Sequence, residues 1–376
     1  MLDPADALGI ENGAVAVYSR AEDYLIRVIR DALKKAGESP TWAEAQLLAI
    51  RQERWRIEGM ALALEKRSQD MWLQAIDEAY VRGMLAAERE LASIPPSVLP
   101  TDPLFSAAAV NNKAVLAIAA DGIAGMNQVH RNILRRTDDI WRQISNEAIG
   151  YSTTGSMTPY EAAKRAFTRM SRDGLGFFTD KAGRKWGLDT YAEMAVRTGT
   201  NQALRAGHTA SMLEHGVDLV VVASHPNPAP MCAPYERKVL SLTGRFAPGT
   251  HRLGDRIVNV TATMAEAEGN GLHHPNCRHR HSAYIPGYTD LTEPEPDPGN
   301  EGYKATQQQR YLERQIRASK RMEEAAIDPQ DVRAAKQRAR NYQARLREHI
   351  EAHDLPRRRH REQLRREAKG AVGQEY

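Results

Sequence analysis

Long stretches of helical periodicity, separated mainly by proline-rich breaks, constrain the fold of this chain more than any other feature. Apolar side chains recur at helical spacing over residues 14–36, 39–67, 70–93 and 106–149. The second stretch opens with a capping box formed by Thr41 and Glu44. Four prolines within residues 93–103 end this group, because proline cannot continue a helix. We therefore predict an N-terminal helical arm or bundle over 1–100 and a second helical region over 101–174.

The pattern changes from helical to mixed near residue 175. Just before it, Thr158, Pro159 and Glu161 form a helix start signal. Beyond it, two short apolar arms around residues 180–183 predict a β-hairpin. A helix over 190–216 then leads into a β-branched, continuously apolar strand.

That strand, residues 217–224, is followed by a turn-rich segment that ends near residue 287. We predict a predominantly helical α+β fold. Its later parts are a small loop-rich α+β module, a linker rich in proline and acidic residues, and a basic helical tail, at residues 175–290, 291–304 and 305–376. Breaks near Asp328–Pro329 and Leu355–Pro356 predict that the tail is a long helix or a pair of helices.

Basic charge is concentrated in the tail. The whole chain carries 52 Lys and Arg against 48 Asp and Glu, whereas residues 305–376 carry 18 against 11. The tail therefore has a surplus of seven positive charges, which is typical of contact with a polyanion. The candidate residues for contact with DNA or an acidic partner are Arg357, Arg358, Arg359, Arg361, Arg365 and Arg366. A solvated helical face stabilised by ion pairs explains the same charges equally well.

Two cysteines, Cys232 and Cys277, are too few for a disulfide framework. We therefore expect folding and assembly in a reducing cytoplasm. Acidic residues stand where a signal peptide would be basic, and the apolar runs are too short to span a bilayer. No membrane association is expected.

The stretch GLHHPNCRHRHSAYIPG at 271–287 is unusually rich in histidine. Together with the earlier stretch HPNPAPMC it offers nitrogen and sulfur ligands of the kind that zinc prefers. The candidate metal ligands are His225, Cys232, His274, Cys277 and His279. Their spacing matches no strict zinc-finger pattern, so bound zinc is one interpretation and no cofactor is certain.

Two other interpretations of this stretch stay open. The histidines could hydrogen-bond nearby carbonyls around a buried Cys277, which would then behave as a small apolar side chain. Alternatively, Cys277 could be a nucleophile with a histidine base, although no oxyanion-hole signature accompanies it. The chain has no Walker A loop, dinucleotide glycine fingerprint, HExxH or GxSxG motif. We therefore expect no catalytic residues and no enzyme activity.

The stretches SHPNPAPMCAPYERKVLSLTG and GLHHPNCRHRHSAYIPG, in this order, resemble the phage minor capsid protein 2 family, which is related to the phage Mu F-like head morphogenesis proteins. The resemblance covers about residues 170–350 and, more weakly, the helical N-terminal half. It implies that Pro234, Tyr235, Lys238 and Ser241 shape a strand and loop beneath the HPNCRH loop. Related proteins often have cysteine in place of His279 and a second cysteine beside Cys232, so this chain departs from the family at both positions.

The resemblance implies a structural component of the virion of a tailed phage, made in the host cytoplasm and present in few copies near the portal. Its expected partners are the portal protein, head proteins and, through the tail, packaged DNA. Two alternatives remain. One is an enzyme or toxin module in 175–290 that depends on Cys277, His274 or Glu193. The other is a sequence-independent nucleic-acid-binding protein. All structural predictions require the turns carrying Cys232 and Cys277 to pack together beside strand 217–224.

Overall fold

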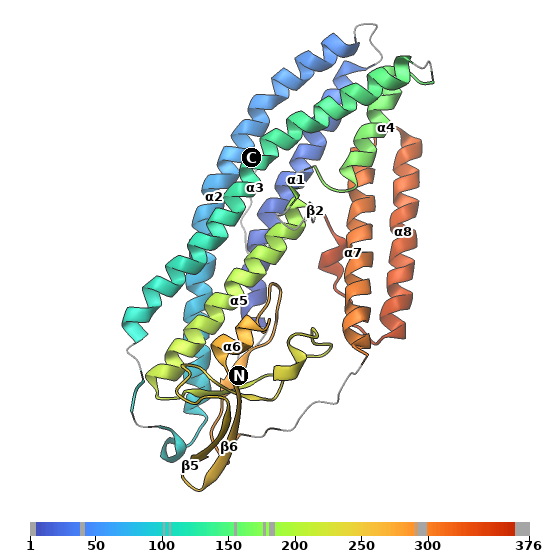
Figure 1. The fold of residues 1–376 in the computed structure, drawn as a ribbon. Helices are drawn as coiled ribbons and strands as arrows, with labels where there is room; N and C mark the ends of the chain where they lie inside the picture. Colours follow the sequence, from blue (N-terminus) through green and yellow to red (C-terminus); the bar gives the residue numbers. More distant parts are fainter. Residues whose placement is uncertain are drawn as a thin grey trace. The chain divides into compact units, whose positions relative to one another are not determined.

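The computed structural model describes residues 5–37, 42–100, 102–104, 107–153, 156–175, 178–179, 185–289, 291 and 299–364. Long helices dominate (Figure 1), and five of the described strands form one mixed sheet. The predicted α+β, predominantly helical fold class is thus confirmed. None of the described helices has both the length and the apolar composition that crossing a bilayer requires.

The chain divides into two compact units, each assembled from three separate segments. The first unit contains Met1–Glu11, Met71–Gly122 and Met194–Thr306, and the second contains Asn12–Asp70, Ile123–Glu193 and Gln307–Tyr376. The units are therefore interleaved along the sequence. The five consecutive segments expected from the sequence stay a prediction about how the chain is organised.

In the first unit, parts of α2 (Trp42–Ala92), α3 (Ala107–Thr153) and α5 (Leu188–Glu214) pack around the buried ring of Trp72. A Cβ atom added at Gly122 or Gly199 would lie 2.4 or 2.7 Å from that ring. Only glycine leaves room for the indole between these helices. The side chain of Trp72 therefore fills the space between the three helices.

Helix α2 joins two segments that the sequence pattern separates into 39–67 and 70–93. It runs without interruption through 51 residues. The residues between the two predicted segments include neither glycine nor proline, and the Ser68 hydroxyl donates a hydrogen bond to the Glu65 carbonyl 2.8 Å away. Nothing at this point stops the helix, so the prediction of two helices was wrong. The capping box predicted at Thr41 and Glu44 falls outside the residues whose side chains are described.

The sheet has the strand order β5-β6-β4-β3-β7. Its strands are β3 (Leu219–Val222), β4 (Val239–Ser241), β5 (Gly249–Leu253), β6 (Arg256–Thr263) and β7 (His281–Ala283). Strands β4 and β6 pair in parallel, and the other pairs are antiparallel. All four residues of β3 are buried, which confirms the predicted buried strand within 217–224.

Asp218, one residue before β3, anchors the turn that leaves β4. Its carboxylate accepts hydrogen bonds from the Ser241 hydroxyl at 2.5 Å and from the Thr243 amide and hydroxyl at 2.8 and 2.6 Å. Three donors compensate the burial of this charge. The short helices η2 (Ala233–Tyr235) and α6 (Met264–Gly269) complete the module, and η1 (Pro96–Val98) follows α2.

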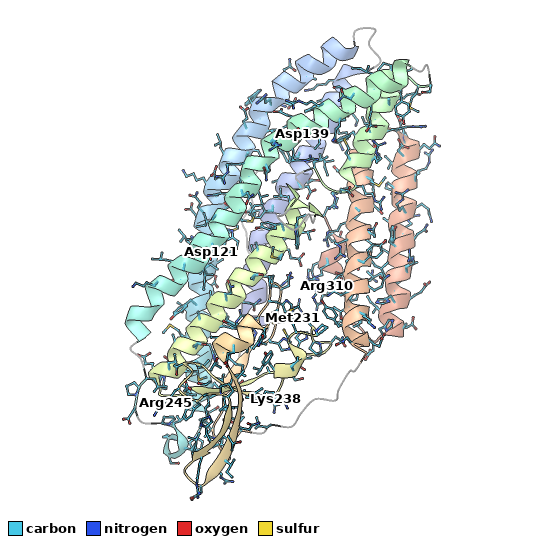
Figure 2. All side chains as sticks on the ribbon, viewed as in Figure 1. Asp121, Asp139, Met231, Lys238, Arg245 and Arg310 are labelled. Carbon is cyan, nitrogen blue, oxygen red and sulfur yellow. The ribbon has the colours of Figure 1, made fainter. Side chains whose placement is uncertain are left out.

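The second unit contains most of α1 (Ala5–Ala36), α4 (Pro159–Ser171) and the helix pair α7 (Glu301–Ala325) and α8 (Pro329–Ala352). Helix α4 begins with the predicted capping box: the Thr158 hydroxyl accepts from the Glu161 amide, and the Glu161 carboxylate accepts from the Thr158 amide. Helix α3 carries Asp121 and Asp139 among its polar side chains (Figure 2).

The tail forms the helix pair that its prolines predict, with breaks at both expected positions. Leu312 and Ile316 of α7 pack against Leu346 of α8 in a small apolar cluster. The short helix η3 (Arg359–Glu362) follows. Strands β1 (Phe178–Thr179) and β2 (Lys185–Trp186) pair antiparallel as predicted, although the turn between them lies outside the described residues.

Candidate functional site

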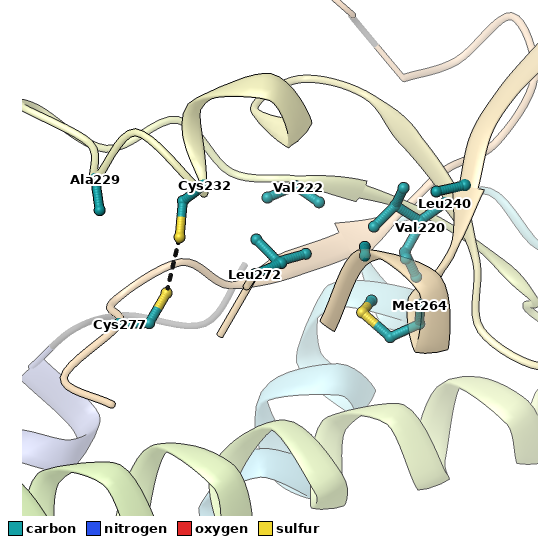
Figure 3. Close-up of a cluster of buried hydrophobic side chains, with 10 residues drawn as sticks. Val220, Val222, Ala229, Cys232, Leu240, Met264, Leu272 and Cys277 are labelled. Carbon is teal, nitrogen blue, oxygen red and sulfur yellow. Dashed lines mark hydrogen bonds between the residues drawn. The ribbon is translucent and has the colours of Figure 1, made fainter. Parts of the chain in front are cut away.

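Two loops of the first unit bring the two cysteines together. Cys232 lies in the loop after β3, and Cys277 lies in the loop before β7. Val222, the last residue of β3, pairs with His281, the first residue of β7, so both loops leave the sheet at the same end of these two strands. The cysteine Sγ atoms are 3.7 Å apart and point toward each other (Figure 3). The predicted packing of the two turns is thus confirmed.

Each cysteine is held by a tight local turn within the apolar core of the module. The Cys232 amide donates to the Ala229 carbonyl, and the Cys277 amide donates to the His274 carbonyl, both at 2.8 Å. Asn276 adopts a positive φ of 67°, a conformation that asparagine tolerates better than most residues. Its side chain accepts a hydrogen bond from Arg197 of α5 at 3.0 Å, and its amide donates to the Thr198 hydroxyl at 3.2 Å. Helix α5 therefore sets the position of the second loop.

His279 links the two loops through both of its ring nitrogens. Nδ1 lies 3.4 Å from Cys277 Sγ, and Nε2 lies 2.7 Å from a carboxylate oxygen of Glu236. Since a carboxylate accepts, Nε2 carries a proton, and Nδ1 faces Cys277 Sγ. The same Glu236 oxygen accepts from the His225 amide at 2.7 Å, so it braces both loops.

The neighbouring groups shift the pKa values of Cys232, Cys277 and His279 in different directions. The hydrogen bond from Cys232 lowers the pKa of Cys277 and, against the opposing effect of burial, bonds from His273 and His279 act in the same direction. The same sulfur–sulfur bond, followed by burial, raises the pKa of Cys232. Burial alone would lower the pKa of His279, but its bonds to Cys277 and Glu236 outweigh burial and raise that pKa to about 9. The site thus favours a thiolate at Cys277.

Three of the five predicted metal ligands lie together. Donor atoms of Cys232, Cys277 and His279 are all within 4.8 Å of one another, and all three residues are buried. The ring of His225 is close by, with its centroid 5.8 Å from that of His279. His274 is not part of this group, and its Nδ1 is hydrogen-bonded to the Pro275 carbonyl at 2.8 Å.

The sequence interpretation missed two residues at this site. His273, rather than His274, approaches the sulfur atoms, with Nδ1 4.0 Å from Cys277 Sγ. Glu236 supplies the carboxylate that orients His279. A carboxylate partner is usual for a histidine that binds a metal, so an acidic residue just after Cys232 was the available signal.

A second buried polar chain ties β7 to the helices of the first unit. His281 Nε2 lies 3.0 Å from the Thr209 hydroxyl, and His208 Nε2 lies 3.2 Å from the Glu90 carboxylate. Glu90 also accepts from the Ala283 amide at 2.7 Å. These bonds anchor the strand that follows the cysteine loop to α2 and α5.

The arginine cluster predicted to contact DNA includes two residues that are engaged internally. Arg361 is 5% exposed, and its guanidinium lies 2.8 Å from Glu193 and 3.7 Å from Glu313. Because a buried charge requires such partners, Arg361 is not presented to solvent and is corrected to a structural residue. Arg357 forms two parallel hydrogen bonds with the Glu362 carboxylate, at 2.8 and 3.0 Å.

The prediction of contact with DNA or an acidic partner is unchanged for the other arginines of the cluster. Arg359 is exposed and Arg358 is half-buried. Arg365 and Arg366 lie outside the described residues. Contact with DNA or an acidic partner through these four residues and through Arg357, which is exposed, stays a prediction.

Comparisons with known proteins place the module and its helices in a phage context. A relative described as "Structural protein", from Lactococcus phage LL-H, is 28% identical over 226 residues. That alignment covers 57% of this chain and 59% of the relative, so the chain spans somewhat more than half of the relative's length. No solved structure matches the chain significantly. The family described as phage minor capsid protein 2 matches residues 2–351 of the 376, and the chain therefore belongs to this family of phage structural proteins.

Proposed function

We propose that the protein is a non-enzymatic component of a tailed-phage head that is bound at the portal vertex and contacts packaged DNA through its basic tail. The observation that carries this proposal is the family match over residues 2–351, which includes the helices as well as the cysteine-bearing module. Long helices suit docking to a ring of subunits, and a rigid module suits a fixed place in an assembly. Virion placement follows from the same role, with assembly in the host cytoplasm.

Burial of the cysteine pair supports a structural role over a catalytic one. Cys232 and Cys277 are 0% and 5% exposed, and both lie in the apolar core of the module. A nucleophilic thiol must reach an electrophilic atom of its substrate, such as a carbonyl carbon or the phosphorus of a phosphoryl group. The enzyme hypothesis therefore requires the module to open. Glu193, another residue that this hypothesis names, is half of a buried ion pair with Arg361.

The exposed basic side chains of α8 support a polyanion contact more strongly than the residues expected from sequence. At about 100° per residue, Arg333, Lys336, Arg340 and Arg347 fall on one stripe, roughly 60° wide and 21 Å long. All four are exposed, whereas Ala335, Ala339 and Leu346 form the buried face. The stripe provides charges that phosphates can bind without sequence readout.

The portal assignment is tested by an inventory of purified, DNA-filled particles. We expect mass spectrometry to find the protein in few copies per particle and co-sedimentation to find it with the portal protein in head extracts. Particles from a phage lacking the gene provide the control. A protein absent from DNA-filled particles, or present at the copy number of the major shell protein, contradicts the assignment.

The DNA contact is tested by the salt dependence of binding to duplex DNA. Replacing Arg340 and Arg347 with glutamine should reduce the slope of log K against log salt by about 2, because each phosphate contact contributes about 0.9. Lys66→Gln with Arg67→Gln changes the net charge equally at exposed positions of α2 and should leave the slope unchanged. Equal effects of the two double variants would show that net charge, rather than the α8 stripe, is responsible.

A further inference from the structure

The cluster of Cys232, Cys277 and His279 has the dimensions of a tetrahedral zinc site. Two thiolates at about 2.3 Å from one zinc ion lie about 3.8 Å apart, and a thiolate and an imidazole nitrogen lie about 3.6 Å apart. The observed sulfur–sulfur distance is 3.7 Å, and Cys277 Sγ is 3.4 Å from His279 Nδ1. A disulfide would need sulfur atoms about 2.05 Å apart. The side chains are thus spaced for a shared ion.

The surroundings of these donors also match those of a metal ligand set. His279 donates its other ring N–H to the Glu236 carboxylate, the arrangement that fixes the tautomer and raises the basicity of a zinc-bound histidine. The His279 amide lies 3.4 Å from Cys277 Sγ and donates to it, which stabilises the negative charge of a thiolate. Glu236 is itself buried and braced by the His225 amide.

The fourth position can be assigned by comparing two nearby histidines. His225 Nδ1 lies 2.6 Å from the Pro226 carbonyl, so Nδ1 carries the proton and Nε2 keeps its lone pair for a metal. Binding of a metal by His273 through Nδ1 would leave the proton on Nε2, a buried atom with no hydrogen-bond partner among the described residues. An unsatisfied buried donor costs free energy, so His225 is the better ligand.

We propose that Cys232, Cys277, His279 and His225 bind one zinc ion, which clamps the loop after β3 to the loop before β7. Binding displaces the protons that the two sulfur atoms and His279 Nδ1 carry in the metal-free protein, and the two thiolates neutralise the charge of the ion. Three of the four donors, Cys232, Cys277 and His279, are buried, which favours a closed structural site over a catalytic one. This inference goes beyond the proposed place of the protein in the phage head and does not depend on it.

The test is the metal content of the full-length protein, purified without chelators and loaded with zinc alone. We expect one zinc per chain by elemental mass spectrometry. Replacement by cobalt should give the visible and thiolate charge-transfer bands of a four-coordinate ion with two sulfur ligands. Cys277→Ser should abolish stoichiometric binding. Glu236→Gln should weaken it by about 10- to 100-fold, because it removes only the group that orients a ligand.

Matched histidine variants test the ligand set. His225→Gln should weaken zinc binding by more than Glu236→Gln does, whereas His273→Gln and His274→Gln should retain one zinc per chain. Far-UV circular dichroism checks that each variant keeps its helices. The cobalt spectrum is measured on the unaltered protein, so it does not depend on whether a variant folds.

A wild-type protein without stoichiometric zinc, or a Cys232–Cys277 disulfide in freshly isolated protein, overturns the proposal. Loss of zinc in His273→Gln but not in His225→Gln overturns the ligand assignment. None of these outcomes bears on whether the protein is found in the particle.

Discussion

Replacing Gly83 with alanine tests the tightest helix contact of the first unit. A Cβ atom at Gly83 of α2 would lie 2.0 Å from the Leu204 carbonyl oxygen and 2.9 Å from its carbonyl carbon, both in the main chain of α5. Ordinary contact begins near 3.4 Å, so the two helices would have to separate by about 1.4 Å. Main-chain atoms cannot rotate away as the end of a side chain can, so the whole contact must give.

Two opposing effects set the expected magnitude. Alanine favours a helix over glycine by about 1 kcal/mol. Overpacking costs about 1–3 kcal/mol, and a clash with main-chain atoms belongs at the upper end of that range. We therefore expect Gly83→Ala to reduce the free energy of unfolding by about 2 kcal/mol. Gly59 of α2 is exposed and has no atom within 4 Å of an added Cβ, so Gly59→Ala should instead stabilise by about 1 kcal/mol.

Thermal unfolding followed by far-UV circular dichroism measures both effects. At about 2–4 °C per kcal/mol, Gly83→Ala should lower the midpoint by about 4–8 °C, and Gly59→Ala should raise it by about 2–4 °C. Gly207→Ala is an independent check, because its Cβ would lie 2.1 Å from the Tyr80 carbonyl oxygen and the expected sign is the same. A neutral or stabilising effect of Gly83→Ala would refute the close approach of α2 and α5.

Three further predictions concern buried groups. Asp218→Ala should destabilise the module by about 2–4 kcal/mol in urea unfolding, because it leaves three donors without their acceptor. An unchanged unfolding midpoint would show that water replaces the carboxylate. Leu346→Ala should cost about 2–5 kcal/mol and Leu346→Met less than about 1.5 kcal/mol, so equal losses would contradict its packing between α7 and α8. Burial lowers the pKa of His130 to about 4 from 6.5. The buried neutral ring therefore contributes stability that is fully present above pH 6.5. This contribution, on the order of 2–3 kcal/mol, is lost as the pH falls from 6.5 toward 4. His130→Phe should retain the stacking on Tyr18 and flatten that part of the stability–pH curve, and a curve unchanged by the substitution would exclude His130 as its cause.

Local chemistry in the sequence determined where several elements begin and end. The Thr158, Pro159 and Glu161 start signal specifies the beginning of α4, since the cap, the fixed φ of proline and the reciprocal carboxylate act within one turn. Pro329 likewise begins α8. The apolar run at 217–224 predicts the buried strand β3, because a strand buried on both faces needs no alternation. The convergence of the two cysteine turns was also predicted.

The tertiary structure alone decided which side chains meet. His273 approaches Cys277 while His274 does not, because the loop is positioned by Arg197 and Thr198 of α5. Arg361 is buried although it stands within an arginine run, because Glu193 and Glu313 come from distant helices to neutralise it. Residue type and short-range spacing control local turns and helix ends, which depend on a few neighbouring groups. The partners of a buried charge or a ligand atom depend on packing between segments far apart in the chain, which local pattern does not encode.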